Sequence, residues 1–138
     1  MSNLINLLDT YKGEKRELYP LTPSQMGVYL SCMHNPKGTM YNIPCTYVFD
    51  SGSLDTDRLI NAVRKAVDNH PIMKIFIDNS TGSPMMKPRD SVEFDIPVVQ
   101  VDDLEQAGKD FVKPFDLEKD ILFRFAIFEC GDKSMFAM

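Results

Sequence analysis

The sequence predicts an α+β fold, in which a layer of helices packs against a largely antiparallel or mixed sheet to form a two-layer sandwich. Three stretches place apolar residues at helical spacing, and runs rich in β-branched and aromatic residues lie between them, bounded by turn residues. One run, Ile121–Phe128, is apolar on both faces. Such a strand is normally central in a sheet that is covered on both sides.

Composition and charge narrow the class of protein. With 138 residues, 43% of them hydrophobic and 25% charged, the chain is expected to form one globular, soluble domain. A net charge of −5 without a Lys/Arg stripe argues against nucleic-acid binding. Three cysteines without C-x-x-C spacing indicate reduced thiols in a cytoplasmic protein, and two histidines do not complete a zinc site. The apolar run Leu4–Leu8 is too short to span a membrane.

The chain divides into a lead-in, residues 1–18, and the body, residues 19–138. The first helix of the body is expected to begin at Thr22, which can cap it, with Pro23 at the first helical position and Gln25 completing a capping box. Asn35-Pro36 ends this helix. Ser24 lies in its first turn, where a hydroxyl usually serves backbone N–H groups and is not a nucleophile.

The middle of the body predicts a strand, a capped helix and a hairpin. The strand is Cys45–Phe49, and Asp55 caps a helix with an apolar face that ends at Asn69-His70-Pro71. A strand over Met73–Asp78 and a possible return over Pro84–Lys87 follow.

The C-terminal part predicts a further strand, a helix and a strand hairpin. The elements are a strand over Ile96–Val101 with Pro97 at its start or on an edge, a helix over Leu104–Val112, the strand Ile121–Phe128, and a return strand over Ser134–Met138. The return strand is expected to stop early and to leave half its ladder groups unpaired, so that Ser134–Met138 could pair with a second copy as an exposed edge.

Taken without a family, the residues form no convincing active site, and we assign none as catalytic, cofactor-binding or metal-binding. His70 follows a helix C-terminus and is expected to cap or pack. Arg124 lies within an apolar strand, where a guanidinium needs acceptors. Its partner is either a carboxylate such as Asp116 or a group beyond Met138, and its role is structural in both cases.

An ordered series of motifs resembles the condensation domains of nonribosomal peptide synthetases. The series consists of Tyr19–Gln25, Tyr41–Pro44, Gly52–Asp55 with the helix after it, Asn69–Lys74, and Pro114–Leu117 with Arg124. Within it, the candidate family-motif residues are Ser24, Gln25, His70, Lys74, Phe115, Asp116 and Arg124. The sequence departs from the family's second motif, although His70 is retained: Asn69 and Lys74 replace arginines, Pro71 replaces a glutamate, and Ile75 replaces a threonine.

The resemblance implies a fold similar to chloramphenicol acetyltransferase, with two lobes around a tunnel. Residues 19–138 would form an incomplete first lobe, cut before the family's His-His-x-x-x-Asp-Gly motif. The parent enzyme would form amide bonds between acyl and aminoacyl thioesters, which carrier domains present on phosphopantetheine. The chain alone is expected to be inactive and to bind no cofactor directly, and its partners would be the carrier domains and the second lobe.

Two alternatives remain open. Epimerisation domains, cyclisation domains and carrier-dependent acyltransferases share this architecture, so the reaction can differ while the lobe does not. The other alternative is a non-catalytic module that binds a carrier domain or associates with itself through Ser134–Met138.

Overall fold

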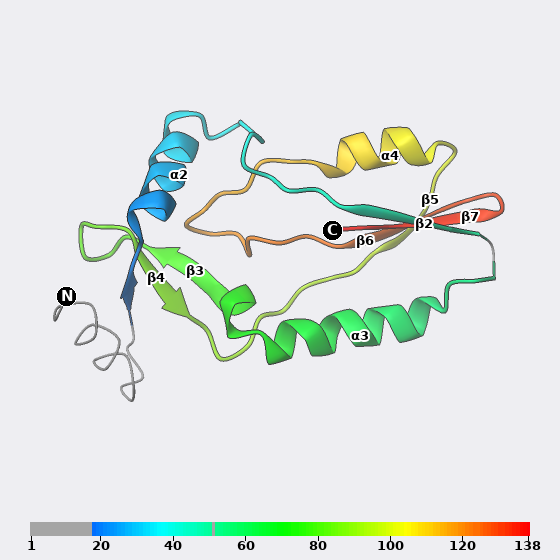
Figure 1. Cartoon of the computed structure of the whole chain (residues 1–138), viewed down its shortest axis with the longest axis horizontal. Helices are drawn as coiled ribbons and strands as arrows, with labels where there is room; N and C mark the ends of the chain where they lie inside the picture. The colour runs from blue at the N-terminus through cyan, green and yellow to red at the C-terminus, as the bar shows by residue number, and fades with distance from the viewer. Residues whose placement is uncertain (1–17, 51) are drawn as a thin grey trace, which may run out of the picture.

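The computed structural model describes residues 18–50 and 52–138 and contains two sheets (Figure 1). The larger sheet has the strand order β2-β7-β6-β5, formed by β2 (Thr46–Asp50), β7 (Lys133–Ala137), β6 (Ala126–Cys130) and β5 (Val98–Gln100). β7 is antiparallel to both of its neighbours, β2 and β6, whereas β5 is parallel to β6. The sheet is therefore mixed, and the expected α+β class is confirmed.

The smaller sheet lies at the other end of the molecule, beside the helix α2 (Pro23–His34) (Figure 1). It is antiparallel, with the order β1-β4-β3, and consists of β1 (Tyr19–Pro20), β4 (Met85–Pro88) and β3 (Ile75–Asp78). A 3₁₀ turn, η1 (Pro71–Lys74), leads into β3. The lead-in, residues 1–18, lies outside the described residues except for Leu18.

Helices cover both faces of the larger sheet, so the sheet is the middle one of three layers, where two layers were expected. In Figure 1, α3 (Thr56–Asn69) runs along one side of the sheet and α4 (Leu104–Phe111) along the other. The neighbouring residues Met135 and Phe136 of β7 point to opposite faces, as strand geometry requires. Met135 lies against Gly108 of α4, while Phe136 belongs to the core beneath α3.

The core lies between α3 and the larger sheet. Val67 of α3 and Ile127 of β6 are fully buried, and Ile96, Phe125 and Phe136 complete the cluster. The rings of Phe125 and Phe136 stack with centroids 6.0 Å apart. Phe94 meets Phe123 edge-on at 5.1 Å, and both rings also contact Phe125. These aromatic contacts hold the chain segment before β6 against the sheet.

Side-chain caps begin all three described helices, as predicted for α2 and α3; the cap of α4 was not predicted. The Thr22 hydroxyl accepts from the N–H of Gln25, and Gln25 Oε1 accepts in return from the N–H of Thr22, which is a complete capping box. Asp55 caps α3 through the N–H of Arg58, and Asp103 caps α4. The helix expected over Leu104–Val112 ends one residue earlier, at Phe111.

Two strand predictions are wrong in their extent. The strand expected over Ile121–Phe128 pairs only from Ala126 and runs on to Cys130; the stretch before it has no ladder partner among the described residues, although Phe123 and Phe125 pack against each other there. The strand expected from Met73 begins at Ile75, since Pro71 starts a 3₁₀ turn. Pro97 comes directly before the edge strand β5, as predicted.

The prediction that Ser134–Met138 is an open edge is also wrong. β7 lies between β2 and β6 and pairs with both along its whole length. Beyond β7, Met138 and Cys45 exchange two backbone hydrogen bonds of 2.8 and 2.9 Å. The sequence around Cys45 gave no sign of this pairing, because the two partners lie far apart in the chain. A homodimer through this strand therefore has no free ladder to use.

Candidate functional site

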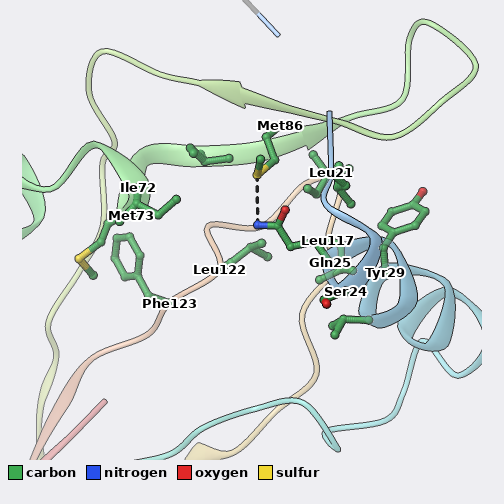
Figure 2. A pocket seen from close by; sticks show the side chains of 13 residues that line it. Leu21, Ser24, Gln25, Tyr29, Ile72, Met73, Met86, Leu117, Leu122 and Phe123 are labelled. Carbon is green, nitrogen blue, oxygen red and sulfur yellow. Dashed lines mark hydrogen bonds between the residues drawn. The ribbon is translucent and has the colours of Figure 1, made fainter. Parts of the chain in front are cut away.

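Two adjoining pockets of about 540 and 570 Å³ form an apolar groove in the described part of the chain. The first pocket lies between the start of α2 and the small sheet, and Figure 2 shows its side chains. The second pocket lies between the end of α2, the loop before β2, and the segment before β6. Both pockets share the lining residues Val28, Met73, Leu117, Leu122 and Phe123. We call the two pockets together the groove.

Two of the predicted motif residues, Ser24 and Gln25, line the first pocket (Figure 2). The capping box fixes Gln25, whose Nε2 donates to the sulfur of Met86 across the pocket at 3.6 Å. This contact joins α2 to β4. Ser24 lies in the first turn of the helix, and none of the other described residues that line this pocket is a His, Lys, Asp or Glu.

A polar cluster at the rim of the first pocket was missed from the sequence. The Tyr29 hydroxyl donates to Glu118 Oε1 at 2.8 Å, and Asn79 Nδ2 donates to both Tyr29 and Glu118. Burial raises the pKa of Tyr29, and the hydrogen bond to Glu118 raises it further. The cluster ties together α2, the loop after β3 and the turn over residues 116–120. Its members lie dozens of residues apart, so no local signal could have revealed it.

Arg124 lines the second pocket, and its hydrogen-bond partners among the described residues are backbone carbonyls and not a carboxylate. Its Nη1 donates to the carbonyls of Phe111 and Lys113 at 3.5 and 3.3 Å. The guanidinium carbon lies 4.4 Å from the ring centroid of Phe115, which is a cation–π contact. The candidate salt bridge between Arg124 and Asp116 is therefore absent. The Lys113 carbonyl also accepts from Asn42 Nδ2 at 2.8 Å, so Asn42 and Arg124 hold the same segment.

Asp116 instead pairs with Lys119, three residues along the chain, at 3.0 Å. The hydrogen bond from Lys119 holds the pKa of Asp116 below its usual range, and the backbone N–H of Glu118 lowers it further. Asp116 pairs with Lys119 and not with Arg124 because a turn brings residues i and i+3 together at little entropic cost. Asp116 does not line either pocket.

We expect Lys119→Met to raise the pKa of Asp116 toward the unperturbed aspartate value of about 3.9. An NMR titration of the Asp116 carboxyl carbon measures this shift. Because the folded-state pKa of Asp116 lies below its unfolded value, its contribution to stability is present above the unfolded pKa and is lost as the pH falls through the folded pKa. Lys109→Met, which removes the exposed pair with Glu105, should leave Asp116 unchanged. An unmoved pKa in Lys119→Met would contradict the assignment.

His70 and Lys74 lie outside the groove and act on the backbone. His70 Nδ1 donates to the carbonyl of Ala66 at 2.6 Å, at the C-terminus of α3, so the expected capping role is what the geometry shows. Lys74 Nζ donates to the carbonyls of Asp68 and Asp90 at 3.1 and 3.0 Å, joining the end of α3 to the loop after β4. Neither residue lines either pocket.

The described part of the chain contains no group of three or more His, Cys, Asp or Glu side chains that could hold a metal ion. None of its helices is long and apolar enough to cross a membrane. Cys32 and Cys45 line the second pocket as free thiols, and Cys130 is also free. Among the described residues, the groove thus presents an apolar surface and one positively charged side chain, that of Arg124.

The family described as Condensation domain matches residues 15–138, and this chain belongs to that family. It is 31% identical to bacitracin synthase 3 of Bacillus licheniformis over 124 residues, which cover 88% of this chain and 2% of that protein. It is 29% identical to gramicidin S synthase 2 of Aneurinibacillus migulanus over 125 residues, covering 88% of this chain and 3% of that protein.

Solved structures show the same fold. The starter condensation domain of rhizomide synthetase superimposes with a TM-score of 0.75 at 18% identity, covering 88% of this chain and 32% of that chain. The condensation domain of a monacolin K polyketide synthase gives a TM-score of 0.72 at 22% identity, covering 87% of this chain and 29% of that chain. The chain therefore spans about a third of these structures and a small part of the synthases.

Proposed function

We propose that the chain forms much of the first lobe of a condensation domain that makes amide bonds in a nonribosomal peptide synthetase. In the reaction, the amine of an acceptor aminoacyl thioester attacks the carbonyl of a donor acyl thioester. The new C–N bond forms as the C–S bond breaks, the donor thiol leaves, and the amine loses a proton. Both substrates would arrive on phosphopantetheine arms of carrier domains, and the lobe itself would bind no further cofactor.

The observation that carries this proposal is the position of the groove relative to β7. Arg124, Cys45 and Met138 line the second pocket, and Met138 directly follows the central strand β7. In the family that the sequence resembles, this strand leads into the His-His-x-x-x-Asp-Gly motif. The groove would therefore adjoin the catalytic histidine of the complete domain. No residue within the described part of the chain takes a catalytic role, and neither His34 nor His70 lines a pocket.

Exposed apolar side chains beside the second pocket support the proposal that a second lobe covers this lobe. Met40 is 76% and Ile43 86% exposed, while Leu30 and Met33 of α2 are 59% and 49% exposed. Large apolar side chains that are exposed to this extent are typical of interaction sites. A second lobe would bury it and would close the groove into a tunnel.

The alternatives differ in how well the geometry supports them. An epimerisation or cyclisation domain, or a carrier-dependent acyltransferase, would use the same lobe and groove. A self-associating module loses its expected interface, since β7 is already paired on both sides. We predict a cytoplasmic location and partners among carrier domains for each of the enzymatic alternatives.

The test is the coding sequence that follows Met138 in the parent gene, together with an assay of the chain alone. We expect the codons after Met138 to encode His-His-x-x-x-Asp-Gly, and a stop codon or an unrelated sequence would overturn the proposal. We expect the 138-residue chain to form no amide from carrier-bound donor and acceptor, as followed by mass spectrometry. Amide product from the chain alone would contradict the assignment of catalysis to a residue outside it.

A further inference from the structure

We infer that the groove selects a donor whose acyl group is an aliphatic chain without a free ammonium group, bound with its carbonyl end near Arg124. The inference rests on the proposed function and deepens it, because condensation domains in general are expected to accept aminoacyl donors as well. It depends on three features of the groove: its continuity, the commitment of its polar groups, and its charge.

The two pockets of the groove adjoin at a set of apolar residues that lines both of them. Val28, Met73, Leu117, Leu122 and Phe123 form this wall, along which the pockets meet. The first pocket is also lined by Leu21 (Figure 2), Ile75 and Ile77, and the second by Phe111, Phe115 and Arg124. Flexible side chains such as Met73 and Met86 adapt readily to an apolar ligand. A ligand that filled both pockets would be long and apolar.

Much of the polar lining is already committed to the protein. Gln25 uses its oxygen for the N–H of Thr22 and its nitrogen for Met86, while Tyr29 donates to Glu118 and Asn42 donates to the Lys113 carbonyl. A peptide-like ligand buried along this wall would leave its own amide groups without partners, and each unpaired group would weaken binding by its lost hydration. An aliphatic chain carries no such groups and therefore loses no hydrogen bonds to water when it is buried.

The charge of the lining opposes a free amine. Among the described residues, Arg124 is the one charged side chain that lines either pocket, and no Asp or Glu lines them. A donor with an α-ammonium group would bring a second positive charge toward this guanidinium, where no described carboxylate lines the pocket to offset it; Glu118 lies at the rim of the other pocket and is bonded to Tyr29 and Asn79. Within the described chain, Nη1 of Arg124 is committed to two carbonyls, which leaves its other nitrogens to donate to an acyl carbonyl.

The experiment measures binding of three N-acetylcysteamine thioesters to the purified 138-residue chain by calorimetry: octanoyl, dodecanoyl and leucyl, each below its critical micelle concentration. We expect dodecanoyl to bind more tightly than octanoyl, by up to about fourfold per added methylene if every methylene is buried, which is ~0.8 kcal/mol converted at 25 °C. We expect the leucyl thioester to bind at least about tenfold more weakly than octanoyl. Equal or tighter binding of the leucyl thioester would overturn the inference, as would the absence of saturable acyl binding.

Three variants, of which Leu30→Trp is the control, locate the binding site. Leu122→Trp places a larger side chain where both pockets are lined, and it should weaken dodecanoyl binding by more than about tenfold. Leu30 is exposed on α2 and lines neither pocket, so Leu30→Trp should leave dodecanoyl binding unchanged. Arg124→Met should remove most of the discrimination between octanoyl and leucyl thioesters. Circular dichroism and thermal unfolding confirm that each variant is folded, and the Leu122 and Leu30 pair tests the site if Arg124→Met does not fold. Dodecanoyl binding that is unchanged in Leu122→Trp would contradict the inference that the acyl chain binds in the groove.

The outcome is separable from that of the proposed function. A His-His-x-x-x-Asp-Gly motif after Met138 with no acyl selectivity would retain the condensation domain and remove the aliphatic donor. Acyl binding without that motif would retain an acyl-binding groove and remove the condensation reaction.

Discussion

Phe125→Ala is expected to lower the free energy of unfolding by about 3–5 kcal/mol. Phe125 is 7% exposed and contacts three other rings, those of Phe94, Phe123 and Phe136. Its removal would lose the transfer free energy of a phenyl group and leave a cavity beneath α3, because the surrounding sheet relaxes only in part. Since single domains are typically stable by about 5–15 kcal/mol, this one change would remove much of the stability of the chain.

Urea unfolding followed by circular dichroism measures the loss. Val48→Ala is the matched control, because Val48 is 57% exposed on the edge strand β2 and its truncation should cost less than about 1 kcal/mol. Phe125→Leu should fall between the two, since it keeps most of the apolar volume. A loss in Phe125→Ala no larger than that of Val48→Ala would show that the aromatic cluster does not carry the core.

The features predicted from the sequence are those with local causes. The Thr22 capping box, the Asp55 cap and the apolar face of α3 depend on residues within one or two turns of each other, and all are present in the structure. The turn before β7 is another case: Gly131 has a φ of +57°, a conformation that glycine adopts without strain. His70 also acts locally, through a carbonyl four residues before it.

The features that sequence reasoning missed depend on contacts between distant segments. β2 joins β7 although nearly the whole body separates them, and this pairing converts the expected open edge into a central strand. Arg124 satisfies its guanidinium with main-chain carbonyls, which every residue supplies and which no side-chain pattern reveals. The groove itself is a property of packing, because its lining comes from several separate stretches of the chain. Ser24, Gln25, Phe115 and Arg124 do reach it, whereas His70, Lys74 and Asp116 do not.

Ser134→Pro is expected to destabilise the chain because β7 is central. Met138 and Cys45 form a hydrogen-bonded pair, and such pairs alternate along an antiparallel ladder. Ser134 and Phe49 therefore also form one, with the Ser134 N–H donating toward β2. Proline removes this donor and leaves the Phe49 carbonyl unpaired, which costs roughly 1–3 kcal/mol. The proline ring adds steric strain within a strand that has neighbours on both sides.

Val48→Pro provides the matched control. By the same alternation, Val48 faces Met135 in a non-hydrogen-bonded pair, so its N–H points away from β7 at the free edge of β2. Proline is tolerated at such edge positions, and the loss in the free energy of urea unfolding should be clearly smaller than for Ser134→Pro. If β7 were instead an open edge beside β6, the Ser134 N–H would face solvent and Ser134→Pro would be tolerated. If Ser134→Pro lowers the free energy of unfolding by no more than Val48→Pro does, β7 is an open edge strand after all. Self-association through β7 would then again be possible.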